Sequence, residues 1–322
     1  MSKIVLAKKN TTDVSDMRDA FCESLLALAA EDDRIVLVDA DLMGAMGTKP
    51  FLQKYPKRAI DCGVQEANMV GLACGLAVQG KIPFAHTFAV FCSRRANDQV
   101  FLSGAYNKAN VKLVGSDPGI TAAYNGGTHM AFEDMGIMRS IPTMTVVEPT
   151  DVVMLKNLMP KIAFTEGMFY MRLVRRDVIK VYDEGADFEI GKAAVLSRGS
   201  DVTIIASGYC VSEAVSAAQI LAEQGVSAGV VNMFTWKPVD EEVILEAAAA
   251  TGAIVTAENH NVINGLGSAV AEVLVRNKPV PVEMVGVRDE FGEVGPVSYL
   301  RERFGLTDRH ITEAVKRVLA RK

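Results

Sequence analysis

The chain has 322 residues, 49% of them hydrophobic and 23% charged, which is the composition of a globular protein with roughly two domains. Its net charge of −5 gives no electrostatic reason to expect nucleic acid as a partner, and no apolar run approaches the ~18 residues that cross a membrane. The N-terminus lacks a signal-peptide pattern, and five cysteines without a CxxC pair favour the reduced thiols of a cytoplasmic protein over a disulfide or metal framework.

Strand-like and helix-like segments alternate through the first part of the chain. This alternation is typical of an α/β fold with a mostly parallel sheet. The first helix, at residues 15–30, is expected to begin at a Ser or Asp cap. Strands are predicted at residues 35–38, 58–60, 82–86, 111–115, 144–147 and 169–174, and further helices at 66–78, 97–107, 132–139 and 151–159.

A polar, glycine-containing interval without clear periodicity follows at residues 181–191, and we interpret it as a linker. The predicted division is therefore a first domain at 1–180, a linker at 181–190 and a second domain at 191–322. In the second domain we predict strands at residues 202–206, 229–232, 254–257 and 282–287, and helices at 211–224, 240–250, 266–275 and 308–320.

Glu66 is a carboxylate on an apolar helix face. Val70, Ala73 and Ala77 follow it at i+4, i+7 and i+11, so these side chains share one face of the predicted helix. A carboxylate on a buried face must be hydrogen-bonded, protonated or paired. The simpler alternative is a first-turn glutamate that interacts with its own helix N-terminus. Gly71 and Gly75 form a small-residue ridge that permits close packing.

Polar residues follow several of the predicted strands. Asp39 and Asp41 come after the first strand, His86 ends the third, and Asp117 follows the fourth. In open α/β sheets the ligand crevice lies outside the carboxyl ends of the strands, so this grouping predicts a site. Helix capping is the alternative explanation for each residue taken singly.

Two short stretches add candidates. His129 follows two glycines and precedes a helix pattern, which favours exposure in a crevice. Phe88 and Phe91 are three residues apart, with Arg94 on the same side, although ordinary core aromatics are the simpler interpretation. The chain has no P-loop, no GxGxxG after the first strand, and no HExxH or GxSxG, so these motifs support neither nucleotide binding nor the common hydrolase classes.

Several ordered blocks together resemble the transketolase family. DADL (39–42), GVQEANMVGLACGLA (63–77), TFAVF (87–91), GGTHMAFEDMGIMRSIP (126–142) and EPTD (148–151) resemble its pyrimidine-binding domain. SGYCVSEAV (207–215), AENH (257–260) and GLGSAVAEVL (265–274) resemble its C-terminal domain. The resemblance implies two doubly wound α/β domains, the first with the thiamine-diphosphate-binding fold.

The resemblance also implies a missing part. A full-length transketolase has an N-terminal domain whose GDG motif holds thiamine diphosphate through Mg²⁺, and no GDG occurs in this sequence. We therefore expect the C-terminal subunit of a split transketolase, with the metal held mainly by a separate N-terminal subunit and an α₂β₂ assembly.

Site roles follow from the same resemblance. The glutamate that matches Glu66 hydrogen-bonds the aminopyrimidine ring of the cofactor and promotes removal of the thiazolium C2 proton; an apolar pocket would raise its pKa. Phe88 and Phe91, with Arg94 beside them, match the aromatic wall of the cofactor pocket. Asp41 and Leu42 match the segment that lines the cofactor. His129 matches a histidine that contacts the donor sugar near its carbonyl group.

The departures from the family concern the substrate. Either Ala45 or Met43 stands where a phosphate-binding serine is expected, and Asp117 replaces a phosphate-binding histidine, so that Arg175 alone is retained as an anion ligand. Asp117 would repel a phosphate at contact distance. Asn125 replaces an aspartate that reads the sugar hydroxyls, and an amide can donate as well as accept.

His86 stands where the family has a small residue. We hypothesise that its imidazole enters the pocket and takes over part of the work of the missing histidine, so that His86→Ser would sharply reduce turnover. A core or surface histidine is the alternative.

The sequence thus predicts two-carbon ketol transfer from a modified or branched ketose, such as apulose 4-phosphate or a sulfo-sugar, to an aldose. The alternatives are the β-subunit of a 2-oxo-acid dehydrogenase, which shares the glutamate and the domain order, and a non-catalytic regulatory paralogue.

Overall fold

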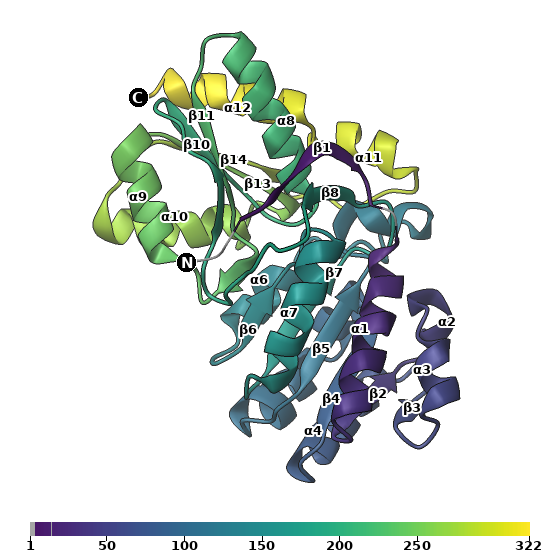
Figure 1. The fold of residues 1–322 in the computed structure, drawn as a ribbon. Coiled ribbons are helices and arrows are strands. Elements are labelled where there is room, and N and C mark those ends of the chain that lie inside the picture. The colour runs from purple at the N-terminus through teal and green to yellow at the C-terminus, as the bar shows by residue number, and fades with distance from the viewer. Residues whose placement is uncertain (1–3, 14) are drawn as a thin grey trace.

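The structure is a computed structural model that describes residues 4–13 and 15–322. Its elements form two α/β units, each built on a mainly parallel sheet, with helices on both sheet faces (Figure 1). This arrangement confirms the predicted fold class of two doubly wound domains.

The first unit contains a seven-stranded sheet in the order β12-β6-β7-β5-β4-β2-β3, parallel except for β12. Its central strands β2, β5 and β7 are buried at every residue, because helices cover both faces of the sheet. Their bounds are β2 Ile35–Asp39, β3 Ala59–Asp61, β4 Ile82–Phe88, β5 Lys112–Ser116, β6 Thr145–Val147, β7 Phe169–Leu173 and β12 Thr235–Lys237.

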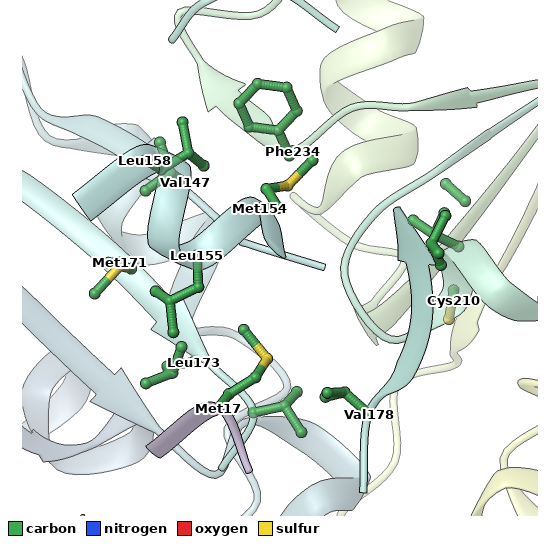
Figure 2. Packing of buried hydrophobic residues seen from close by; sticks show 14 of the residues in the cluster. Met17, Val147, Met154, Leu155, Leu158, Met171, Leu173, Val178, Cys210 and Phe234 are labelled. Atoms are coloured by element: carbon green, nitrogen blue, oxygen red, sulfur yellow. The ribbon is translucent and has the colours of Figure 1, made fainter. Parts of the chain in front are cut away.

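Two long helices, α1 (Met17–Glu31) and α7 (Val152–Phe164), pack together on one face of this sheet, and α4 (Glu66–Val78) lies on the other (Figure 1). Figure 2 shows part of the hydrophobic core between these helices and the sheet, where Leu155 of α7 lies near Leu173 of β7. The apolar cluster continues into the second unit, so the two units share one core.

The second unit has a five-stranded sheet in the order β14-β13-β10-β11-β9, parallel except for β9. Helices α8 and α12 pack on one face, and α9 and α10 on the other (Figure 1). The bounds are β9 Ala194–Ser197, β10 Val202–Ala206, β11 Ala228–Asn232, β13 Ile254–Asn261, β14 Val282–Val287, α8 Cys210–Glu223, α9 Glu241–Thr251, α10 Leu266–Asn277 and α12 Asp308–Leu319.

The sequence analysis does not predict several short elements. The strand β1 (Leu6–Thr12) pairs antiparallel with β8 (Ile179–Tyr182), so the first two residues of the expected linker belong to a strand. In addition, β12 lies in the second half of the sequence yet completes the first sheet. The other elements without a predicted counterpart are β9, α2 (Met43–Met46), α3 (Lys49–Lys54) and α11 (Val297–Arg303).

Two helix predictions need correction. Asp16 occupies the N-cap position of α1, but its side chain makes no capping hydrogen bond. The helix predicted at 97–107 is broken into α5 (Asn97–Gln99) and a π-helix at Val100–Tyr106, and a second π-helix precedes them at Phe91–Arg95. The wider π-helical turn changes which side chains align.

The remaining irregular helix is the 3₁₀ segment Gly119–Asn125, and α6 (Asp134–Ser140) follows it. None of the helices among the described residues is long and apolar enough to cross a membrane.

Lys112 gives this fold a testable pH dependence. Its buried ammonium group at the start of β5 donates to the carbonyl oxygens of Thr165 (2.5 Å) and Gly167 (3.2 Å). Burial lowers the pKa of Lys112 to about 7, so between pH 7 and 10 the unfolded chain binds a proton that the folded chain lacks. Stability should therefore rise with pH in this window, by at most about 1.4 kcal/mol per unit.

Urea unfolding of the wild type and of Lys112→Met from pH 6 to 10 measures this slope. We expect the stability of the wild type relative to the variant to increase as the pH rises. A constant difference between the two proteins would contradict the prediction.

Candidate active site

The carboxyl ends of four parallel strands, β2, β4, β5 and β7, meet at one edge of the first sheet. Asp41, Asp117 and Arg175 each lie on the loops that leave these ends. Parallel strands bring such loops together, which is why residues distant in sequence form one crevice here.

Glu66 is the first residue of α4 and is only 2% exposed. Val70 and Ala73 behind it are fully buried, which confirms the apolar helix face. The carboxylate itself is paired: Nη1 of Arg95 donates to both of its oxygens, at 2.9 and 3.0 Å. The sequence indicates an apolar environment for Glu66, but the structure adds a guanidinium that satisfies the buried charge.

Three rings gather beside this ion pair. The imidazole of His129 meets Phe91 edge-on, with the ring centroids 5.1 Å apart, and meets Phe88 at 5.8 Å. The guanidinium of Arg95 lies over the Phe91 ring at 4.1 Å, and that of Arg175 lies 5.4 Å from the centre of Phe88. All three rings are half-buried, so they offer flat apolar surface at the crevice.

Arg94 and Arg95 have different partners. The exposed Arg94 forms an ion pair with Glu133 (2.7 Å) and donates to the carbonyl oxygen of Thr128 at 3.4 Å. It therefore holds the loop that carries His129, whereas Arg95, which the sequence prediction missed, contacts Glu66. Both arginines lie in the π-helical turn Phe91–Arg95, where α-helical spacing misjudges which side chain faces inward.

The turn after β2 is held by carboxylates. Asp41 has a left-handed backbone (φ 63°), and its N–H donates to Oδ1 of Asp61 at 2.9 Å. The N–H of Leu42 donates to Oδ1 of Asp39 at 2.5 Å. Asp41 is exposed and Leu42 is half-buried, so this predicted pair lies at the open edge of the crevice.

His86 does not enter the pocket, and this part of the sequence hypothesis is wrong. Its side chain is fully buried between neighbouring strands. Nδ1 lies 2.7 Å from Oδ2 of Asp39, and Nε2 lies 3.0 Å from Oγ of Ser116. The imidazole therefore forms a hydrogen-bonded layer beneath the site, with both ring nitrogens engaged.

Asp117 and Arg175 form an ion pair at the other end of the crevice. Nε of Arg175 donates to Oδ1 of Asp117 at 2.6 Å, and Nη2 contacts Oδ2. Both residues line a cavity of about 690 Å³ together with the exposed Asn125. Desolvation raises the pKa of the Asp117 carboxyl above its ordinary value, although the hydrogen bond from Arg175 opposes the shift.

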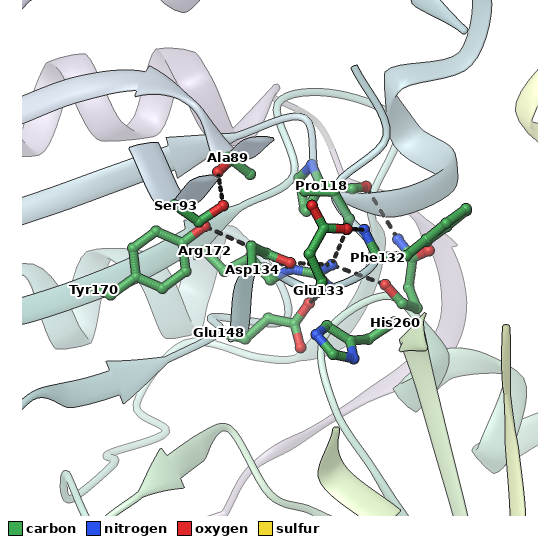
Figure 3. Close-up of polar contacts among 12 residues, drawn as sticks. Ala89, Ser93, Pro118, Phe132, Glu133, Asp134, Glu148, Tyr170, Arg172 and His260 are labelled. Atoms are coloured by element: carbon green, nitrogen blue, oxygen red, sulfur yellow. Dashed lines mark hydrogen bonds and ion pairs between the residues drawn. The ribbon is translucent and has the colours of Figure 1, made fainter. Parts of the chain in front are cut away.

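A buried arginine supports the crevice from below. Arg172 donates to both oxygens of Asp134 (2.9 and 3.0 Å), to Glu148 at 2.8 Å, and to the carbonyl oxygens of Ala131 and Asn259 (Figure 3). Asn259 belongs to the second unit, so this one guanidinium joins the two domains.

Asn259 also holds the loop after β5. Its Oδ1 accepts from the N–H of Ile120 (3.0 Å), and its Nδ2 donates to the carbonyl oxygen of Pro118 (3.2 Å). Gly119 between them has a positive φ (54°), and a Cβ there would lie 2.2 Å from Oδ1 of Asn259. The close approach requires glycine.

Six of the predicted residues are joined by direct contacts that run through Arg95, whereas His86 lies one layer deeper. Asp41, Leu42, Arg94 and Asn125 have other contacts around the same crevice. Glu66, Arg95, Phe91, His129, Phe88, Arg175 and Asp117 form one continuous line of contacts. Among the residues that the structure describes, no group of three His, Cys, Asp or Glu side chains could hold a metal ion.

Comparison with known proteins gives matches over nearly the whole chain. The family model described as the transketolase pyrimidine-binding domain matches residues 13–180, and that of the transketolase C-terminal domain matches residues 191–311. A 6-deoxy-6-sulfo-D-fructose transketolase subunit from Clostridium sp. strain MSTE9 is 56% identical, with 95% of each chain covered.

Two further matches agree with this. An apulose-4-phosphate transketolase subunit from Phocaeicola vulgatus is 38% identical over 85% of this chain and 88% of the relative. A solved split gene transketolase, described as an inactive β4 tetramer, is 42% identical and superposes with a TM-score of 0.89 over 95% of this chain and 99% of its own.

The layer beneath the site predicts a stability effect. His86→Leu would leave Oδ2 of the buried Asp39 carboxylate without its hydrogen-bond partner, and we expect a loss of about 3 kcal/mol in the free energy of unfolding. His86→Gln should lose less, because its amide can still donate. Urea unfolding of the isolated chain measures both variants, and equal stability of His86→Leu and the wild type would refute the prediction.

Proposed function

The chain belongs to the transketolase family as the C-terminal subunit of a split transketolase that works with a partner subunit, and we propose that it takes part in thiamine-diphosphate-dependent transfer of a two-carbon ketol unit from a modified ketose to an aldose. The observation that carries this proposal is the continuous line of contacts from Glu66 to Asp117.

The residues present fit one half of the cofactor. A nearly buried carboxylate, Glu66, lies beside the half-exposed rings of Phe88 and Phe91, a combination that suits a flat ring with hydrogen-bonding nitrogens. Asp41 and Leu42 would line the same pocket. When bound, thiamine diphosphate supplies an electron sink for the two-carbon fragment. We assign its diphosphate and Mg²⁺ to a GDG-bearing N-terminal partner.

Glu66 and His129 have separate tasks in this proposal. The carboxyl group of Glu66 exchanges a proton with a nitrogen atom of the cofactor's ring. At least one of its oxygens must be free for this step, so Arg95 has to release one of its two hydrogen bonds to Glu66. The Nδ1 atom of His129 lies 2.9 Å from Oγ1 of Thr128, which leaves Nε2 for the carbonyl oxygen of the donor. Arg94 positions this loop through Thr128 and Glu133.

The substrate end of the crevice departs from the ordinary family pattern. Asp117, Asn125 and Arg175 line the cavity there, and we propose that they bind the distal part of the donor. The relative at 56% identity is named for a sulfo-sugar, and the one at 38% for apulose 4-phosphate. The identities favour a sulfonated six-carbon ketose over a branched sugar phosphate.

The surface around α4 supports assembly with other subunits. Gly71 and Gly75 are exposed, and a Cβ on either would meet no atom within 4 Å. Val64 and Val78 flank these glycines in the sequence and are also exposed, and the π-helix Val100–Tyr106, which ends in the exposed Tyr106, contacts α4. We propose that this surface packs against other subunits in an α₂β₂ complex. All five cysteines are free thiols, which supports our placement of the enzyme in the reducing cytoplasm.

The test is reconstitution with the partner subunit, thiamine diphosphate and Mg²⁺. We expect ketol transfer from a modified ketose with the mixture and none with either subunit alone. Glu66→Gln should lower kcat by at least ~100-fold, because an amide cannot exchange a proton with the cofactor. Glu31→Gln removes an equal charge from the exposed end of α1 and should leave kcat unchanged.

The alternatives give different outcomes in the same assay. Decarboxylation of pyruvate without ketol transfer would favour a 2-oxo-acid dehydrogenase subunit. A mixture that binds the partner but transfers no ketol unit from any ketose would favour a regulatory paralogue.

A further inference from the structure

We propose that Asp117 limits the charge of the donor's distal group, so that the site accepts a singly charged sulfonate and rejects a doubly charged phosphate. The inference rests on the proposed function and concerns the substrate end of the same crevice.

Most N–H groups of Arg175 already have partners within the protein. Nε and Nη2 face the two oxygens of Asp117, and Nη1 donates to the carbonyl oxygen of Ala45 at 2.9 Å. Three of the five N–H groups of this guanidinium are therefore engaged within the protein, which leaves two for a ligand. The Nε–Nη2 fork of this guanidinium, which could hold a phosphate in bidentate fashion, is already filled by a carboxylate.

A second guanidinium lies close by. Nη1 of Arg18 also points at the Ala45 carbonyl oxygen (3.5 Å), and its Nε lies 3.4 Å from Asp16 and 3.6 Å from Asp19. Arg18 thus adds positive charge next to Arg175, but carboxylates of its own helix turn offset it. Arg175 itself still presents its two unused N–H donors to an anion.

The wider cavity has no surplus of positive charge. Among its described lining residues, three cations face three anions: Arg175, Arg176 and Arg301 against Asp117, Asp177 and Glu213. A phosphate monoester carries about −1.5 to −2 at pH 7, whereas a sulfonate carries one charge with the same three-oxygen shape. Repulsion from Asp117 grows in proportion to the ligand's charge, so it disfavours phosphate more.

The position of Asp117 is fixed by its backbone. Its φ is 52°, a left-handed conformation that Asp, Asn and His adopt more readily than other residues. Asn259 of the second domain holds the next residues through Pro118 and Ile120. Because Asn suits the same backbone, Asp117→Asn should keep the loop while it removes the charge.

The experiment compares three six-carbon donors with the reconstituted complex at pH 8, using one aldose acceptor. D-fructose, 6-deoxy-6-sulfo-D-fructose and D-fructose 6-phosphate carry no charge, one charge and two charges at the distal end. For the wild type we expect kcat/KM to be highest for the sulfonate, and at least about tenfold lower for the phosphate.

Asp117→Asn should reduce this sulfonate-to-phosphate ratio about tenfold, which corresponds to ~1.4 kcal/mol. Asp33→Asn is the matched control, since it removes the same charge from an exposed site at the opposite end of β2 and should leave the ratio unchanged. Thermal unfolding establishes that both variants are folded, and the wild-type ratio tests the inference independently of either variant.

The contradicting outcomes are distinct. A wild type that prefers the phosphate or the uncharged sugar, or an Asp117→Asn variant with the wild-type ratio, overturns the charge limit while ketol transfer itself stands. Absence of transfer from all three donors and from apulose 4-phosphate overturns the proposed function, and this inference with it.

Discussion

The buried guanidinium of Arg172 is the interaction on which the arrangement of the crevice depends. A charge with no solvent contact is tolerated only when carboxylates and carbonyl oxygens satisfy it, and Asp134, Glu148 and Asn259 do so from three different segments. Glu148 in turn accepts from Ser207 of the second domain at 2.6 Å. Moving one domain against the other would leave these buried groups unpaired, which is energetically costly. The relative position of the two domains is therefore fixed.

This constraint reaches the loops that carry His129 and Asp117 through the backbone. Arg172 and Gly119 both donate to the carbonyl oxygen of Ala131, two residues after His129. Asn259 anchors the loop after β5 at Pro118, the residue directly after Asp117. The second domain contributes no side chain to the line from Glu66 to Asp117, but its Asn259 helps to hold the loops that carry His129 and Asp117. Its Glu213 and Arg301 also line the cavity beside Asp117 and Arg175.

The sequence predicts the regular part of this fold and the outline of the site, for a physical reason. Parallel strands buried on both faces read as apolar runs, and the loops at their carboxyl ends converge whatever the details. Pairings such as β12 with β6 depend on contacts distant in the chain, which a local pattern does not contain. Arg95 was missed because the π-helical turn breaks the expected spacing, and the burial of His86 depends on partners contributed by two other strands.

Two of the expected departures from the family pattern, His86 and Asp117, are connected through Ser116. A histidine at position 86 needs the carboxylate of Asp39 and the hydroxyl of Ser116, and Ser116 directly precedes Asp117. A change of His86, Asp39 or Ser116 therefore alters the support of the strand end that leads into Asp117, which we propose as part of the donor site. Glu66 and the aromatic rings lie outside it. The contact between Phe88 and Arg175 joins the aromatic rings to the proposed donor site. The hydrogen bond from the N–H of Gly119 to the carbonyl oxygen of Ala131 also joins the loops that carry Asp117 and His129. Under the proposed function, these contacts couple the donor end of the crevice to its cofactor end.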